Sequence, residues 1–112
     1  MLVDWKNLVN NSMKAFGELI KGNPKIGEAM KALDEAGSVH GALDTKTREL
    51  IALAVAASTR CDTCIGVHAK AAAAAGATRE ELLEALAVAV GLNAGAAFVY
   101  SARILEAFDA EK

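Results

Sequence analysis

The fold is decided by residues 44–76, which read DTKTRELIALAVAASTRCDTCIGVHAKAAAAAG. Asp44 is a suitable N-cap for a helix over residues 45–58. Because this helix is apolar on most sides, we expect it to be buried. A further helix is expected from near residue 59, with two cysteines in its first turns and its end at Gly76. No Gly or Pro separates the two helices, so one continuous helix is an alternative interpretation.

Two more helices are predicted upstream of this stretch. Apolar residues recur at three- and four-residue steps over residues 2–20, which is typical of an amphipathic helix. Asn23 and Pro24 resemble an N-cap and a first helical residue, and they open a second helix that Gly37 follows. Residues 37–43 are expected to form a loop.

Downstream, Thr78 and Glu81 form a capping-box pattern that predicts the start of another helix. We expect Gly91, Asn93 and Gly95 to interrupt this helix before a last one begins. No segment alternates in the manner of a strand. The predicted fold class is therefore all-α, a compact bundle of about six helices.

The composition favours a single domain over residues 1–112. Hydrophobic residues make up 54% of the chain but aromatic residues only 4%, and the many alanines favour closely packed helices. The mean hydropathy of +0.26 is high for so short a chain, because a small monomer has too much surface to hide this many apolar groups. We therefore expect a homo-oligomer.

The charge pattern bears on partners and location. The net charge is −2 with both signs interspersed, so no basic stripe is available and nucleic acid is not an expected partner. The longest apolar runs, near residues 50–57 and 85–92, are shorter than the roughly 18 residues that span a bilayer, so no membrane partner is expected. Asp4 and Lys6 argue against a signal peptide, which favours a cytoplasmic location.

The chemistry-bearing motif is formed by Cys61, Cys64 and His68, at positions i, i+3 and i+7. On a helix these side chains share one face. In the cytoplasm a cysteine pair is more often catalytic or metal-binding than structural. Near a helix N-terminus the unpaired N–H groups stabilise a thiolate, which thiol–disulfide exchange requires. A histidine one turn beyond Cys64 can accept or return the thiol proton near neutral pH.

Glu49 is the fourth candidate site residue. If the chain turns back near residue 59, Glu49 lies ten residues before the turn and His68 nine after it, so the two reach similar heights on adjacent helices. A carboxylate in so apolar a helix needs a partner, and Glu49 can orient the imidazole. This placement depends on the turn and fails for a continuous helix.

Several stretches together resemble the carboxymuconolactone decarboxylase superfamily, and more narrowly its alkyl hydroperoxidase D-like branch. The branch has a Glu followed at a distance by Cys-x-x-Cys-x-x-x-His. The resemblance covers roughly residues 40–90. The matching stretches here are GALD at 41–44, RELIALAV at 48–55, Cys61-x-x-Cys64-x-x-x-His68 and GATREE at 76–81.

The resemblance implies an all-α fold assembled as trimers or hexamers, without a metal or organic cofactor. It implies that Cys64 attacks peroxide and becomes a sulfenic acid, that Cys61 resolves it as a disulfide, and that Glu49 and His68 relay the proton. The expected substrate is a hydroperoxide or a protein or small-molecule disulfide, with an unidentified thiol electron donor. From the residues alone, Cys61 is nearer the helix N-terminus and is the more accessible thiol for a partner. Some peroxidase members carry a further His between the cysteines, where this chain has Asp62 and Thr63.

Two other interpretations stay open. One is a cofactor-free lactone decarboxylase, the other activity of the superfamily, which does not depend on a cysteine pair. The other is a non-enzymatic redox-sensing or zinc-binding adaptor, in which Cys61, Cys64, His68 and Glu49 supply four ligands. A purely structural interpretation is that the two cysteines pack as small buried apolar residues.

Overall fold

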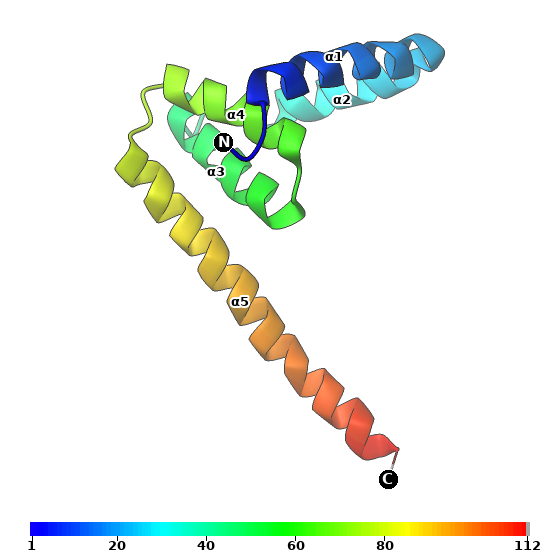
Figure 1. The fold of residues 1–112 in the computed structure, drawn as a ribbon, viewed down its shortest axis with the longest axis vertical. Coiled ribbons are helices and arrows are strands. Elements are labelled where there is room, and N and C mark those ends of the chain that lie inside the picture. The colour runs from blue at the N-terminus through cyan, green and yellow to red at the C-terminus, as the bar shows by residue number, and fades with distance from the viewer. Residues whose placement is uncertain (112) are drawn as a thin grey trace.

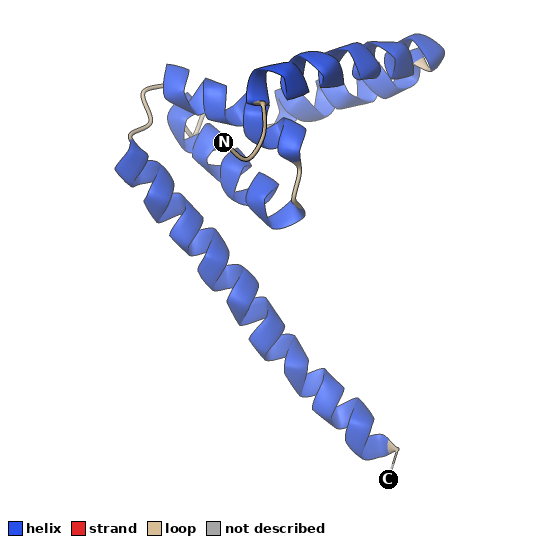
Figure 2. Ribbon diagram, in the orientation of Figure 1, coloured by secondary structure: helices blue, strands red, loops and turns tan. Residues whose placement is uncertain are grey.

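The computed structural model describes residues 1–111 and contains five helices in that range, with no strand (Figure 2). The all-α fold class is thus confirmed, with five helices where about six were expected. The helices are α1 (Trp5–Gly22), α2 (Pro24–Ala36), α3 (Thr45–Thr59), α4 (Asp62–Ala74) and α5 (Arg79–Ala110).

The turn between α3 and α4 is made by Arg60, whose backbone is left-handed with φ 57° and ψ 49°. This conformation lets the backbone N–H groups of both Arg60 and Cys61 donate to the carbonyl oxygen of Ala56, which closes the end of α3. α3 and α4 therefore fold back on one another and pack along their lengths (Figure 1). The turn predicted near residue 59 is confirmed, and the continuous helix is wrong.

The predicted helix starts are found, and most are capped by side chains. The Asp44 carboxylate accepts from the backbone N–H of Thr47 at 2.7 Å, and hydrogen bonding to Thr47 lowers the pKa of Asp44. Thr78 and Glu81 form the reciprocal capping box, with bonds of 3.0 and 2.9 Å. Asn23 is the N-cap of α2 but its side chain makes no capping bond, so that start relies on the proline after it.

The helices are arranged as a central pair with two arms (Figure 1). α3 and α4 form the centre; α5 packs on α3, and α1 packs on α4. Within the described residues α2 packs only against α1. The radius of gyration is 18.1 Å, against about 13 Å for a compact domain of this length, because the far end of α5 extends away from the centre (Figure 1).

The expected interruption at Gly91–Gly95 is wrong, since α5 runs unbroken through it. Each glycine weakens a helix by about 1 kcal/mol relative to alanine, but the surrounding positions are rich in alanine, the best helix former. The Asn93 amide is also satisfied within the helical geometry. It donates to the carbonyl oxygen of Ala89 and to the hydroxyl of Ser58, both at 2.7 Å, and so ties α5 to α3.

A salt bridge fixes the start of α5 against the start of α3. The Lys46 ammonium lies 2.8 Å from the Glu81 carboxylate. The hydrogen bond from Lys46 lowers the pKa of Glu81, and the same bond raises the pKa of Lys46.

The core within the described residues is small. Its buried apolar side chains are Leu53, Ala56 and Ala72, all on α3 and α4. The expectation that α3 is buried holds on one face only, because Ile51 and Val55 remain about half exposed. The reason is that in the described part of the chain α3 packs against two helices, α4 and α5, which cover part of its circumference.

α5 is the one helix in residues 1–111 that is long and apolar enough to cross a membrane, judged by length and composition alone. Its residues 85–102 carry no charged side chain, and α5 has no buried residue. The short apolar run expected at residues 85–92 is thus part of a longer apolar segment. The absence of a membrane partner stays a prediction.

Candidate active site

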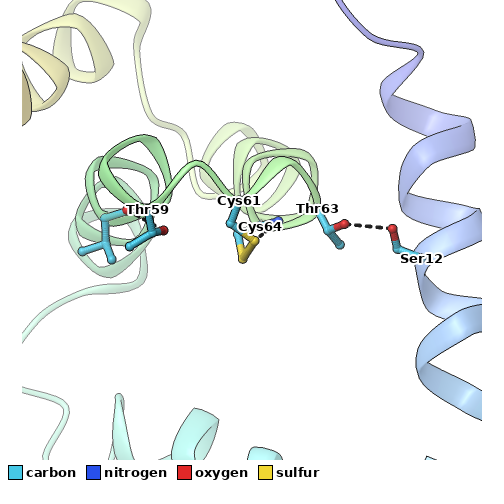
Figure 3. Close-up of a disulfide and its surroundings, with 6 residues drawn as sticks. Ser12, Thr59, Cys61, Thr63 and Cys64 are labelled. Carbon is cyan, nitrogen blue, oxygen red and sulfur yellow. Dashed lines mark hydrogen bonds between the residues drawn. A yellow bond between two sulfur atoms is a disulfide. The ribbon is translucent and has the colours of Figure 1, made fainter. Parts of the chain in front are cut away.

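The structure joins Cys61 and Cys64 as a disulfide at the start of α4, with their Cα atoms 5.2 Å apart (Figure 3). Cys61 is the N-cap of α4, and its sulfur accepts a hydrogen bond of 3.3 Å from the backbone N–H of Cys64. In the reduced chain this position lies at the positive end of the helix dipole, beside unpaired N–H groups. Such a site stabilises a thiolate.

Glu49 and His68 form the second pair of the site. The Glu49 carboxylate Oε2 on α3 lies 2.6 Å from the imidazole Nδ1 of His68 on α4. Both side chains are largely shielded, with 19% of Glu49 and 33% of His68 exposed. The turn at Arg60 brings the two residues together at the heights expected. The contact orients the ring and leaves Nε2 available to a second partner.

The Cys61–Cys64 pair and His68 occupy consecutive turns of α4, and Glu49 reaches His68 from α3. His68 follows Cys64 by four residues on α4, a rise of about 6 Å along the helix axis. Residues at this spacing lie on the same helix face. The cysteine pair and the Glu49–His68 pair are therefore neighbours along one face of α4, the order in which a nucleophile, a proton acceptor and an orienting carboxylate are found in nucleophilic catalysis.

An open pocket of about 470 Å³ lies beside the Glu49–His68 pair. Its walls come from α2, the segment after α2, α3 and α4. The lining residues are Leu33, Asp34, Gly37, Ser38, Leu43, Arg48, Glu49, Ile51, Ala52 and His68. Neither cysteine lines this pocket, so His68 borders a space that is distinct from the disulfide.

Arg48 and the α2 residues of the pocket were not anticipated from the sequence. The Arg48 guanidinium donates to the carbonyl oxygen of Leu43 at 2.6 Å and to the hydroxyl of Thr45 at 3.2 Å, which holds the segment before α3 against the pocket. In the sequence, the one indication that Arg48 belongs to the site is its position directly before Glu49. For the residues of α2 no signal existed, because the packing of α2 depends on tertiary contacts.

The four-ligand zinc arrangement is not formed. Among residues 1–111, no three or more His, Cys, Asp or Glu side chains gather into a group that could hold a metal ion. Glu49 contacts His68, and Cys61 is bonded to Cys64, but the four side chains do not converge on one point. His40 lies in the turn after α2, as expected.

The fold and these two pairs define an all-helical protein with a Cys61–Cys64 pair at the start of α4 and a Glu49–His68 pair between α3 and α4. A profile of the carboxymuconolactone decarboxylase family matches residues 24–107, three quarters of the chain. The chain therefore belongs to the carboxymuconolactone decarboxylase family.

Similar proteins match most or all of the chain, and one of them, a solved structure, is named as a member of the same family. An uncharacterized protein of Haemophilus influenzae is 52% identical over 112 residues, covering 100% of this chain and 99% of that protein. Uncharacterized protein 4 in the cox locus of Paracoccus denitrificans is 41% identical over 95 residues, covering 85% and 86%. The crystal structure of a carboxymuconolactone decarboxylase family protein from Legionella pneumophila superposes with a TM-score of 0.74 at 37% identity, covering 94% of each chain.

Proposed function

We propose that the protein is a thiol-dependent redox enzyme of the alkyl hydroperoxidase D-like branch, acting as a peroxidase or a disulfide reductase. One observation carries the proposal. The paired Cys61 and Cys64 lie at the N-terminus of α4, and the next turn of that helix carries His68, which Glu49 holds at 2.6 Å. This arrangement supplies a nucleophile, a proton acceptor and a group that orients the acceptor.

The peroxidase cycle begins when His68 accepts the proton of the Cys64 thiol. The Cys64 thiolate attacks the terminal oxygen of the hydroperoxide, the O–O bond breaks, and the sulfur becomes a sulfenic acid. The departing alkoxide takes the proton from His68 and leaves as an alcohol. The Cys61 sulfur then attacks the Cys64 sulfur, which forms the disulfide and releases water.

An external thiol donor completes the cycle by supplying two electrons and two protons to the disulfide. In the disulfide reductase variant, the reduced pair instead attacks a substrate disulfide, passes through a mixed disulfide, and closes to Cys61–Cys64. Cys61, at the N-cap, is the thiol that we assign to exchange with the partner.

The test measures disulfide formation directly. Fully reduced protein is treated with one equivalent of an organic hydroperoxide, and thiols are counted by mass spectrometry in the wild type, Cys61→Ser, Cys64→Ser and the control Glu84→Gln. We expect rapid loss of both thiols in the wild type and control, and a sulfenic acid at Cys64 in Cys61→Ser. If both thiols stay reduced toward hydroperoxide and toward disulfide substrates, the proposal is wrong. If they oxidise but no donor and substrate pair is turned over, a redox-sensing adaptor is the better interpretation.

The pocket favours a second candidate function, a cofactor-free decarboxylase of the family's other type. Arg48, Glu49 and His68 line a space that neither cysteine enters, and a cation beside an acid–base pair suits a carboxylate substrate. The cysteines distinguish the two functions. If the protein is a decarboxylase, a Cys61→Ser, Cys64→Ser double variant keeps its lactone decarboxylase activity. If it is a thiol-dependent redox enzyme, the same variant loses all peroxidase and disulfide reductase turnover.

We also propose that the chain works as a homo-oligomer, a trimer or a hexamer, through α5. Support comes from the uncharged residues 85–102 and from large apolar side chains exposed around α5, such as Phe98 at 80%. A second copy of the chain offers the same apolar surface, so association removes both from water.

A further inference from the structure

The first turn of α4 is held by a hydrogen bond from a distant part of the chain. The hydroxyl groups of Ser12 on α1 and Thr63 on α4 lie 2.8 Å apart, and both residues are half-buried. Thr63 stands between Cys61 and Cys64. Figure 3 shows its side chain directed at Ser12, with the cysteine sulfurs on another side of the turn. α1 thus contacts the turn that carries the disulfide.

A second contact places α1 tightly against the same part of α4. A Cβ atom at Gly66 would lie 2.6 Å from the Cγ2 of Val9 and 3.7 Å from the Cε3 of Trp5. Only a glycine permits this approach. Val9 and Ser12 are three residues apart on α1, and Thr63 and Gly66 are three apart on α4, so each pair lies on one helix face. The two contacts therefore form one continuous interface.

This interface secures the side of α4 that α3 leaves uncovered. Within residues 1–111, α4 packs against α3 and α1 alone. The α3 contact holds His68 through Glu49, and the α1 contact holds the Cys61–Cys64 turn through Thr63. Because Gly66 fixes the distance between the helices, the Ser12 hydroxyl is kept within hydrogen-bond reach of Thr63.

We infer that Ser12 is a positioning residue for the redox pair, and that its bond to Thr63 holds the turn in the geometry in which the two sulfurs join. The inference rests on the proposed dithiol–disulfide cycle. Joining the sulfurs removes two electrons and two protons from the thiols, and oxidised glutathione accepts them to become two glutathione molecules. A turn held in the closed geometry favours the disulfide over the dithiol.

The experiment measures the thiol–disulfide equilibrium of the full chain in glutathione redox buffers. We expect Ser12→Ala to lower the equilibrium constant for disulfide formation three- to tenfold, the range expected for one lost hydrogen bond. Thr63→Val is expected to have the same effect, and the double variant no more than either. Ser12→Thr, which keeps the hydroxyl, is expected to stay within twofold of the wild type. A thermal melt of each variant confirms folding.

The control is Ser101→Ala, which removes a hydroxyl whose hydrogen bond within residues 1–111 goes to the Ala97 carbonyl of its own helix. An equilibrium constant unchanged by both Ser12→Ala and Thr63→Val overturns the positioning role alone. An equal decrease in Ser101→Ala also overturns it. If the wild-type pair fails to equilibrate with glutathione, the proposed dithiol cycle is wrong and the positioning role falls with it. Should Ser12→Ala not fold, Thr63→Val and Ser12→Thr still decide the question.

Discussion

The α3–α4 pair and the C-terminal half of α5, residues 94–110, are both rich in apolar residues, yet they differ in what covers them. The pair holds every buried apolar side chain in residues 1–111, and its Glu49 and His68 contact each other across the two helices. The C-terminal half of α5 has no buried residue. A single chain therefore assembles the candidate site but leaves the C-terminal half of α5 without a covering surface.

The largest expected effect concerns self-association through the exposed C-terminal half of α5. Phe98 and Leu105 lie seven residues apart on one face of α5, and both are exposed. Replacing both by Asp places two charges in the proposed interface, so we expect the dissociation constant of the oligomer to rise more than 100-fold. Light scattering over a range of concentrations measures this change. Disulfide formation is expected to persist, because the cysteines lie on α4.

The matched control is Met30→Asp, which charges an exposed apolar side chain on α2. If Met30→Asp dissociates the oligomer and the α5 variant does not, the interface has been assigned to the wrong helix. A wild-type chain that is monomeric in buffer, and partitions instead into lipid vesicles, would contradict self-association and point to a membrane-bound α5.

The next effect concerns the covered pair. Glu49→Gln keeps the size of the side chain but removes the charge that orients His68, so we expect a 10- to 100-fold loss of peroxidase or disulfide reductase turnover. The pH profile of turnover should change while the melting temperature stays close to that of the wild type. Glu80→Gln, an exposed carboxylate on α5, is the control. Equal losses in both variants would remove Glu49 from the mechanism.

A third prediction uses the tight contact between α1 and α4. Helix propensity alone makes Gly66→Ala stabilising by about 1 kcal/mol. The added methyl group meets Val9, however, and overpacking costs about 1–3 kcal/mol, so we expect a net loss of stability in urea unfolding. Gly17→Ala on α1 has nothing within 4 Å and is expected to stabilise the chain. Stabilisation by both changes would mean that α1 does not hold α4 closely.

The smallest effect is the pH dependence of the Lys46–Glu81 bridge. Glu81 has a pKa below its ordinary value of 4.5, so its contribution to stability is complete above pH 4.5 and is lost as the pH falls through the lowered value. We expect Lys46→Met to reduce the melting temperature by about 1–3 °C at pH 7, and by progressively less as the pH falls below 4.5 and through the lowered pKa of Glu81. Lys25→Met, from the more exposed Lys25–Glu28 pair, is the control. A pH-independent difference would contradict this origin.

The features predictable from the sequence are those set by local chemistry. Asp44 caps α3, and Thr78 with Glu81 caps α5, because each cap acts within three residues. The register of the cysteines and His68 on one helix is likewise local. The meeting of Glu49 with His68 was predictable only on the condition that the chain turned.

The features that escaped prediction depend on distant contacts or on unusual backbone geometry. A turn near residue 59 was expected, but a left-handed residue at a helix end is usually Gly or Asn, so the sequence did not identify Arg60 as the residue that makes it. The continuity of α5 follows from alanines that offset two glycines and from the bond between Asn93 and Ser58 on another helix. The pocket wall from α2 and the bond between Ser12 and Thr63 join segments far apart in the chain, which no local pattern records.

The Cys61 sulfur is both the N-cap of α4 and one of the two redox atoms, so the backbone amide that donates to it senses the oxidation state of the pair. The Cys64 amide donates to the Cys61 sulfur, which changes from a weak acceptor in the disulfide to an anionic one in the thiolate. Hydrogen exchange at this single amide should therefore be slower in the thiolate form. A nuclear magnetic resonance signal from one backbone position can thus follow the turnover of the pair without any attached probe.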